Sequence, residues 1–127
     1  MIIWESEENY LETIYILRQD DKPVRSIDIV KELGFSKPSV SVAMKNLRSK
    51  GHITVDSGGY ITLTESGREI AQRMYARHIL ISDCLIYLGV DKDVAERDAC
   101  KIEHGISEQS FIAIQRHVDK WKRNAYK

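Results

Sequence analysis

The sequence predicts a mainly α-helical protein in which one short β-hairpin separates two groups of helices. Three observations lead to this fold class. Apolar residues recur at three- and four-residue intervals over most of the 127 residues, as in helices with one buried face. Two short runs rich in β-branched residues flank the turn sequence Asp56-Ser57-Gly58-Gly59, which predicts a hairpin. Glycine, proline and helix-capping residues separate the remaining segments.

Three helices are expected before the hairpin. The first is amphipathic and ends at the turn sequence Asp20-Asp21-Lys22-Pro23. Ser26 is expected to cap a short second helix, and Gly34 to end it. Ser36 is expected to cap the third helix, whose first turn accommodates Pro38 because a missing N–H costs little there. The expected bounds are residues 5–19, 27–33 and 37–50.

The hairpin is followed by three further helices. Thr64 is expected to cap a long helix, which Gly89 ends. The next helix is expected to start at Asp91 or Asp93, and Ser107 is expected to cap the last one. The expected bounds are residues 52–55 and 60–63 for the strands, and 65–88, 91–104 and 108–121 for the helices.

The order helix, short helix, tight turn, helix, hairpin is that of a winged helix-turn-helix. In this arrangement the second helix spans the DNA backbone and the third enters the major groove, which is ~12 Å wide. We therefore expect a winged helix-turn-helix DNA-binding domain over residues 1–63 and a helical domain over residues 64–127. A winged helix that binds protein or RNA is the alternative for this fold.

Charge is distributed unevenly along the chain, although the formal net charge is zero. Residues 33–55 contain four basic and no acidic residues, whereas residues 1–12 contain four acidic and no basic ones. A neutral protein can still bind DNA through such a segment, because phosphate contacts are made by a local basic patch.

The candidate DNA-binding residues surround the third helix. Small hydroxyl side chains in its first turn allow close approach to DNA, and the helix N-terminus favours phosphate. Lysine and arginine side chains along the helix can neutralise phosphates. The candidates are Arg25, Ser36, Lys37, Pro38, Ser39, Ser41, Lys45, Arg48, Lys50 and, near the tip of the hairpin, Tyr60. In the alternative interpretation, Ser36 is only a helix cap and the lysines form an ordinary solvated face.

A second set of candidates has metal-ligating side chains at helical spacing. Glu96, Cys100, Glu103 and His104 share one face of the fifth helix, where thiolate, carboxylate and imidazole can bind a divalent transition metal. Further donors are available at Asn9, Glu12 and His78. The alternative is that the cysteine is a small core residue and the charged side chains lie on the surface.

Five segments resemble the diphtheria-toxin-repressor family of metal-dependent bacterial repressors, in the order and spacing of that family. These segments are Asn9-Tyr10-Leu11-Glu12-Thr13-Ile14-Tyr15, Ser36-Lys37-Pro38-Ser39-Val40-Ser41, Leu63-Thr64-Glu65-Ser66-Gly67, Arg77-His78 and Ala99-Cys100-Lys101-Ile102-Glu103-His104. The resemblance covers almost the whole chain. It implies a homodimer joined through a helical C-terminal half, which is also the metal-binding domain, and repression of metal-ion homeostasis genes at operator DNA.

The resemblance also implies which residues are ligands. Glu103, His104 and Cys100 match ligand positions, the last being cysteine in the iron branch and glutamate in the manganese branch. His78 matches a ligand in both branches and Glu12 one in the manganese branch, whereas Asn9 departs from both patterns. We expect Fe²⁺ first, because a thiolate favours softer metals than Mn²⁺. Mn²⁺ is next, and Zn²⁺, Co²⁺ or Ni²⁺ are possible substitutes. The chain length resembles that of the short, manganese branch, which has no C-terminal β-barrel.

Other classes of protein are disfavoured. Two cysteines do not make a disulfide framework, so a cytoplasmic protein is expected, and no apolar run approaches the ~20 residues of a membrane span. We expect no enzymatic activity and no small-molecule substrate, because nucleophile elbow, HExxH and phosphate-binding glycine loop are all missing. The main rival is a winged-helix regulator that senses an organic ligand in an apolar pocket lined by Tyr87, Phe111 and Trp121.

Overall fold

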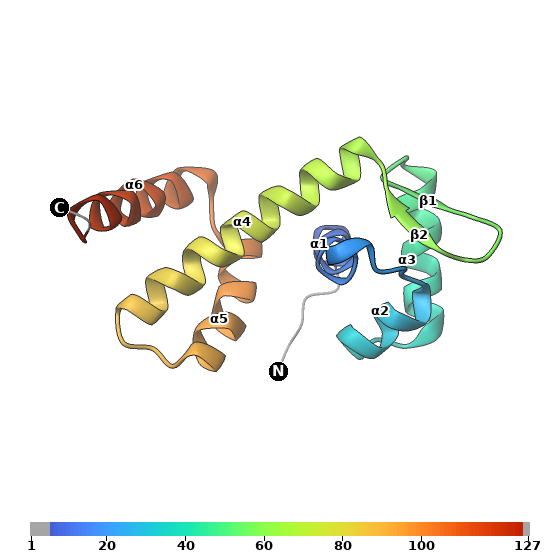
Figure 1. The fold of residues 1–127 in the computed structure, drawn as a ribbon, viewed down its shortest axis with the longest axis horizontal. Coiled ribbons are helices and arrows are strands. Elements are labelled where there is room, and N and C mark those ends of the chain that lie inside the picture. Colours follow the sequence, from blue (N-terminus) through green and yellow to red (C-terminus); the bar gives the residue numbers. More distant parts are fainter. Residues whose placement is uncertain (1–5, 126–127) are drawn as a thin grey trace. The chain divides into compact units, whose positions relative to one another are not determined.

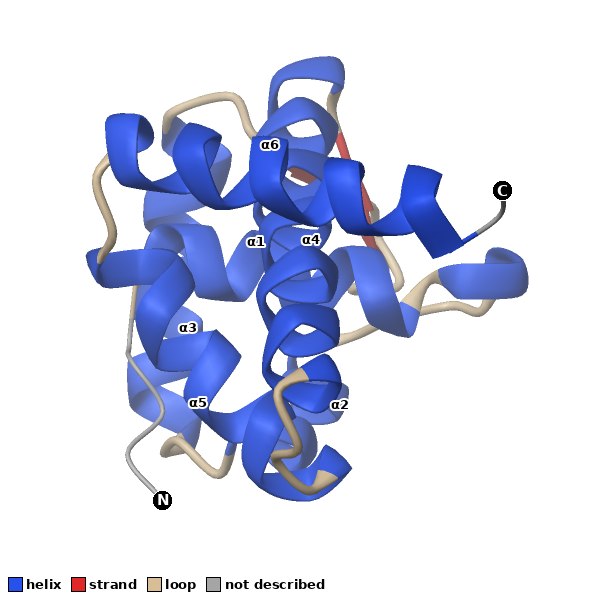
Figure 2. Cartoon of the chain, turned by 90° about the vertical axis from the view of Figure 1, so that its left-hand side faces the viewer, coloured by secondary structure: helices blue, strands red, loops and turns tan. Residues whose placement is uncertain are grey.

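The computed structural model describes residues 6–125. Over this range the predicted order of helices and strands is confirmed, and Figure 2 shows strands only in the single hairpin. The helices are α1 (Glu7–Leu17), α2 (Ser26–Leu33), α3 (Lys37–Ser49), α4 (Glu65–Tyr87), α5 (Lys92–Gly105) and α6 (Glu108–Ala125); the strands are β1 (Ile53–Val55) and β2 (Ile61–Leu63). The chain divides into two compact units, and the boundary along the chain falls between Met74 and Tyr75 of α4.

The N-terminal unit contains α1, α2, α3, the hairpin and the first turns of α4 (Figure 1). Its core takes side chains from all of these elements, so the three helices and the hairpin are fixed around one apolar centre. The buried core residues are Tyr10, Leu11, Ile14, Val24, Ile29, Val40, Met44, Leu47, Ile53, Ile61, Leu63 and Ala71.

The first helix is shorter than predicted. Ser6 caps α1, and its hydroxyl accepts a hydrogen bond from the Asn9 N–H at 3.1 Å. The helix ends at Leu17, two residues before the predicted end, and a 3₁₀ turn over Gln19–Asp21 follows. Within that turn Asp20 has a φ of 63°, which interrupts the helical hydrogen-bond ladder.

The predicted cap of the second helix is wrong by one residue. Ser26 is the first helical residue of α2, and Arg25 is the cap. The reason is that Asp28 supplies the capping interaction: its carboxylate accepts a hydrogen bond from the Arg25 backbone N–H at 2.8 Å. Gly34 ends the helix as predicted, with a φ of 75° that glycine adopts without strain.

The third helix begins as predicted. Ser36 caps α3, and its hydroxyl accepts a hydrogen bond from the Ser39 N–H at 3.2 Å. Pro38 lies in the first turn. Val40, Met44 and Leu47 form the buried face of α3, so the opposite face of this helix is exposed.

The hairpin is fixed at both ends. Val55 pairs with Ile61 next to the turn, where the Asp56 carboxylate accepts hydrogen bonds from the N–H groups of Gly58 and Tyr60, both at 2.9 Å. On the outer side of β2, the Ile61 N–H donates to the Val24 carbonyl at 2.8 Å. The hairpin is therefore held against the segment that leads into α2.

A hydrogen-bonded joint connects the hairpin to α4. The Thr64 hydroxyl donates to the Gly51 carbonyl at 2.7 Å and accepts from the Gly67 N–H at 3.3 Å. The His52 ring lies 2.9 Å from the Ser66 hydroxyl. Gly67 is buried against β1, and a Cβ there would collide with the carbonyl oxygen of His52. This joint fixes the start of α4 against the end of α3.

The C-terminal unit consists of the rest of α4 together with α5 and α6. Its most buried apolar side chains include Ile81, Ala95, Ala99 and Val118. Ser107 caps α6 as predicted, and its hydroxyl accepts from the Ser110 N–H at 3.1 Å. The helix continues four residues beyond the predicted end, to Ala125, because no glycine or proline interrupts it. Among residues 6–125, no helix combines the length and apolar content that crossing a membrane requires.

Replacing Gly67 by alanine tests the joint. We expect Gly67→Ala to lower the free energy of unfolding by ~1–3 kcal/mol, since the added methyl group has no room beside His52. Gly105→Ala is the matched control, because a Cβ at Gly105 meets open space. Thermal melts followed by circular dichroism measure both. A Gly67→Ala melting temperature equal to that of Gly105→Ala would contradict the close approach.

Candidate metal centre and nucleic-acid interface

Three metal-ligating side chains of α5 converge within the C-terminal unit. Cys100, Glu103 and His104 are one turn apart or adjacent along the helix, and each offers a ligand atom within 4.8 Å of the other two. The set combines a thiol, a carboxylate and an imidazole. The helical spacing on which the sequence prediction relied therefore brings these three residues together.

A fourth donor reaches the same carboxylate from α4. The Nδ1 atom of His78 lies 3.3 Å from Oε2 of Glu103, and the Nε2 atom of His104 lies 3.3 Å from Oε1. Glu103 thus lies between two imidazoles that come from different helices. We call His78, Cys100, Glu103 and His104 the four-residue cluster.

Burial makes this cluster unusual. Glu103 is 1% exposed, and the His104 side chain 7%. A buried carboxylate is costly unless cationic or hydrogen-bonding partners compensate its charge. Imidazole, carboxylate and thiolate are ligands of divalent transition metals, and neutral imidazole is the commonest metal ligand among side chains. The donor set therefore fits a divalent transition metal.

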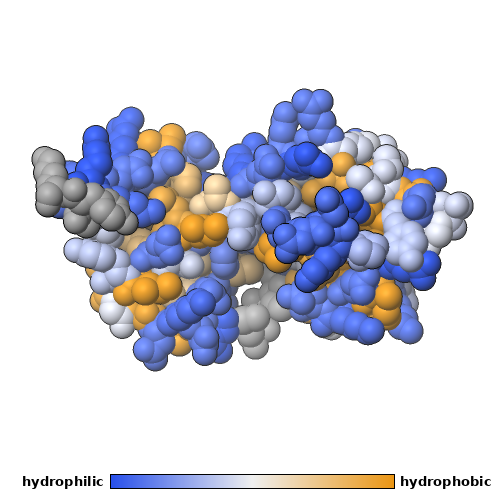
Figure 3. All heavy atoms as spheres, in the orientation of Figure 1, coloured by the Kyte–Doolittle hydropathy of each residue, from blue (hydrophilic) through white to orange (hydrophobic). Residues whose placement is uncertain are grey.

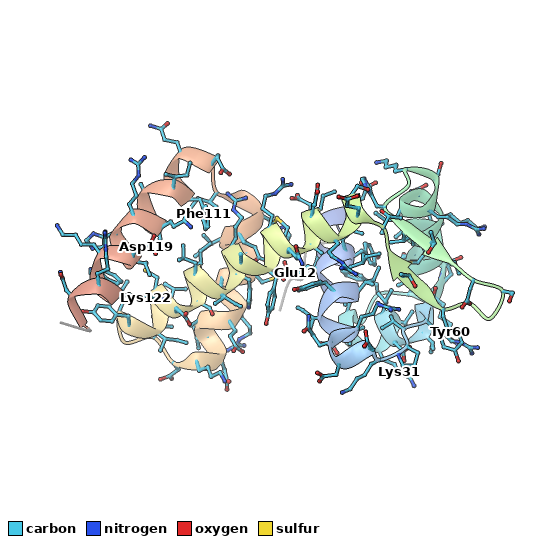
Figure 4. All side chains as sticks on the ribbon, turned by 45° about the horizontal axis from the view of Figure 1, so that its top comes forward. Glu12, Lys31, Tyr60, Phe111, Asp119 and Lys122 are labelled. Carbon is cyan, nitrogen blue, oxygen red and sulfur yellow. The ribbon has the colours of Figure 1, made fainter. Side chains whose placement is uncertain are left out.

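Arg77 lies next to His78 in the chain and fixes α6 near the cluster. Its guanidinium lies 4.7 Å over the ring of Phe111 and 3.7 Å from the Glu108 carboxylate. Figure 4 shows Phe111 in the first turns of α6. This contact was not predicted from the sequence, although Arg77 precedes a predicted ligand histidine and Phe111 is an aromatic residue of α6.

Three further predicted ligands remain: Glu96, Asn9 and Glu12. Glu96 is on α5, one turn before Cys100, but it is exposed and is not among the clustered residues of the described chain. Asn9 and Glu12 are buried residues of α1, in the N-terminal unit. Figure 4 labels Glu12. Their membership of the ligand set stays a prediction.

The candidate DNA-binding residues form an exposed surface of the N-terminal unit. Lys37, Pro38, Ser41, Lys45 and Arg48 are all exposed along α3, away from its buried face. Ser36 and Ser39 are joined through their hydroxyls at 2.9 Å and form the helix cap. The capping role predicted for Ser36 is confirmed, and its contact with DNA stays a prediction.

Two further candidates pair with each other beside α3. The guanidinium of Arg25 lies 4.5 Å over the ring of Tyr60, which extends from the hairpin (Figure 4). A cation over an aromatic face is stabilised by ~0.5–1 kcal/mol at exposed sites. Arg25, just before α2, and Tyr60, in the hairpin, therefore hold one positive charge at the surface of the N-terminal unit.

Lys50 has a protein partner. Its ammonium contacts the Glu7 carboxylate of α1 at 2.5 Å, although both side chains are substantially exposed. This contact neutralises the last cation of the basic segment. It distinguishes Lys50 from Lys37, Lys45 and Arg48, for which no ion pair with a described residue is found.

The aromatic residues of the organic-ligand interpretation are only partly brought together. Tyr87 and Trp121 stack with ring centroids 4.4 Å apart and line an apolar hollow between α4 and α6 with Cys84 and Val118. Phe111 instead contacts Arg77. The hollow therefore lacks Phe111, one of the three aromatic residues that this interpretation expects in its lining.

Comparison with known families matches both halves of the chain. Residues 3–59 match the family described as "Iron dependent repressor, N-terminal DNA binding domain". Residues 64–127 match "Iron dependent repressor, metal binding and dimerisation domain". Helices α1, α2 and α3 and strand β1 therefore fall within the matched DNA-binding domain, and the four-residue cluster falls within the matched metal-binding domain.

Individual proteins give the same result. The chain is 31% identical over 120 residues to the uncharacterised HTH-type transcriptional regulator MJ0568 of Methanocaldococcus jannaschii, covering 93% of this chain and 96% of that protein. It is 32% identical over 113 residues to the transcriptional regulator MntR of Escherichia coli, covering 89% and 73%. A manganese-dependent transcriptional repressor solved with manganese is similar in structure, with a TM-score of 0.82 and 27% identity; the match covers 90% of this chain and 53% of that one.

The chain spans about half the length of that solved repressor. The family match nevertheless extends over both of its units and agrees with the motifs found in the sequence. The chain belongs to the iron-dependent repressor family, a family of metal-dependent, DNA-binding transcriptional regulators.

Proposed function

We propose that this protein represses metal-ion homeostasis genes by binding operator DNA when Fe²⁺ or Mn²⁺ occupies the four-residue cluster. The observation that carries the proposal is the buried Glu103 carboxylate between the imidazoles of His78 and His104. The bound cation would supply the positive charge that offsets this carboxylate.

The proposed ligands are His78, Cys100, Glu103 and His104, and the sequence resemblance adds Glu12 and Asn9 of α1. The cysteine favours Fe²⁺ over Mn²⁺, because thiolate is a softer ligand than carboxylate. Zn²⁺, Co²⁺ and Ni²⁺ can use the same donors. Glu96 is the weakest candidate, because it is exposed and outside the cluster.

The proposed partner is a second copy of the chain, consistent with the matched dimerisation domain. The C-terminal unit exposes apolar side chains, some of which are visible as orange atoms in Figure 3. Exposed apolar surface of this kind marks interaction sites. The exposed residues are Ile79, Ile86, Tyr87, Leu88, Val94 and Ile112. A dimer would bind a pseudo-palindrome, with half-sites about one helical turn apart.

Coupling between metal and DNA requires two states of the protein. The cation can favour DNA binding only if His78, Glu103 and the other ligands hold it more tightly in the DNA-competent state. Such coupling typically amounts to ~1–3 kcal/mol. In that state the ligand side chains keep the α3 surfaces of the two copies at the separation that the operator demands.

Substituting Glu103 tests the metal dependence. We expect Glu103→Gln and His104→Ala to remove the metal stimulation of operator binding, a loss of roughly 5–150-fold in affinity, without unfolding the protein. Gel-shift titrations with Fe²⁺ under anaerobic conditions and with Mn²⁺ measure it. Glu96→Gln, which removes an exposed carboxylate from the same helix, should behave as wild type. If both cluster variants bound DNA in chelator as wild type does in metal, the proposal would be wrong.

Thiol alkylation tests Cys100 as a ligand without DNA. We expect Fe²⁺, Mn²⁺ or Zn²⁺ to slow the reaction of Cys100 with iodoacetamide, because a metal-bound thiolate is not free to attack. Cys84 is an internal control outside the cluster; burial raises the pKa of its thiol, so it should react slowly with or without metal. Peptide mass spectrometry separates the two cysteines. Equal alkylation of Cys100 in metal and in chelator would exclude it as a ligand.

Salt dependence tests the phosphate contacts. We expect Lys37→Ala to weaken DNA binding and to reduce the slope of log K against log salt by about 1. Lys50→Ala should have a smaller effect, because Glu7 already neutralises that ammonium. Glu7→Gln should increase the slope by freeing Lys50, at little cost in stability, since exposed ion pairs contribute ~0–1 kcal/mol. Equal slopes for wild type and Lys37→Ala would remove Lys37 from the interface.

A further inference from the structure

Val42 is exposed in the middle of α3. Its exposed fraction is 58%, compared with 41% for Ile16, 39% for Ile27 and 39% for Tyr60, the other exposed large apolar residues of the described N-terminal unit. Val42 is not among the DNA-binding residues predicted from the sequence.

The geometry of α3 places Val42 opposite the core. The buried face consists of Val40, Met44 and Leu47. Because successive residues advance by 100° around a helix, Val42 lies about 200° from Val40. Pro38 and Lys45, four residues before it and three after it, share its outward face and are also exposed.

Val42 is not part of the core of the N-terminal unit; it lines an open surface hollow with Ser6 and Glu7 at the start of α1 and Asn46 of α3. A β-branched residue in a helix interior is slightly unfavourable compared with alanine, and here no burial compensates for the loss. Isolated exposed apolar residues are common on protein surfaces. This one, however, lies at the centre of an exposed face whose other side chains are polar, basic or proline, including Asn46 one turn later.

We propose that Val42 reads thymine, by packing its methyl groups against the C5-methyl group of that base in the major groove. The inference rests on the proposed function, because it requires α3 to enter the groove. Thymine is the only standard base that presents a methyl group there, and apolar side chains contact it. In the proposed function the cations of α3 contact phosphates, and phosphate contacts carry no direct information about the bases. Val42 therefore contributes specificity where Lys37, Lys45 and Arg48 contribute affinity.

The chemistry separates this contact from hydrogen-bond readout. Replacing thymine by uracil removes the C5-methyl group and keeps every hydrogen-bonding atom of the base. Replacing cytosine by 5-methylcytosine adds the same methyl group to another base. A residue that reads the methyl group responds to both changes, whereas one that reads the hydrogen-bonding edge responds to neither.

The test begins with wild-type full-length protein in Mn²⁺ and a random-sequence DNA duplex pool, from which bound sequences are selected. Each thymine of the selected duplex is then replaced in turn by uracil. At one position of each half-site, we expect a single replacement to raise the dissociation constant about fourfold. This is the factor that burial of one methyl-sized group is worth. Val42→Ala should bind the thymine duplex more weakly and show no further loss with uracil, as in a double-mutant cycle between interacting groups.

Ile16→Ala is the matched control. Ile16 is an exposed apolar residue of α1, so its removal should leave the uracil effect unchanged. If no sequence were enriched, the proposed function and this inference would both fail. If a sequence were enriched but uracil had no effect at any position, or if Val42→Ala kept the full uracil effect, only this inference would be overturned.

Discussion

The buried carboxylate of Glu103 is the constraint on which the C-terminal unit depends. A charge that is 1% exposed must be compensated, and the two imidazoles within 3.3 Å come from α4 and α5. His78 and Glu103 therefore have to be held at a fixed separation by the packing of these two helices. Ala95 and Ala99 of α5 are fully buried as well.

In the N-terminal unit the packing has a different result: it keeps one face of α3 exposed. The face formed by Val40, Met44 and Leu47 anchors α3 in the core, and this anchoring fixes the direction of the exposed face. The hairpin is tied to the helices by backbone hydrogen bonds, and the joint around Thr64 and Gly67 secures the far end of α3. A rigidly positioned helix allows a small apolar side chain such as Val42 to discriminate between bases, because packing contacts act only over short distances.

Local sequence patterns predicted most of the fold, because helical spacing, caps and turns act within a few residues. The cap of α2 was missed since Asp28, three residues on, satisfies the Arg25 N–H and so replaces the role expected of Ser26. At the candidate site, spacing grouped Cys100, Glu103 and His104 correctly, because they share a helix. The same spacing could not show that Glu96 is exposed, or that Glu7 would pair with Lys50 across 43 residues. Those outcomes depend on tertiary packing.

The division of labour between the two units explains why affinity, specificity and regulation can vary separately. In the proposed function, phosphate contacts from the lysines of α3 would set affinity and its salt dependence. A methyl contact from Val42 would set sequence preference without adding charge, so it would survive at salt concentrations that weaken the lysine contacts. The cluster around Glu103 contributes neither, since it lies in the other unit. A cation bound there can influence repression only through the relative stability of two states of the protein. A change of metal preference at Cys100 would therefore alter when the protein binds DNA and leave unchanged which sequence it binds.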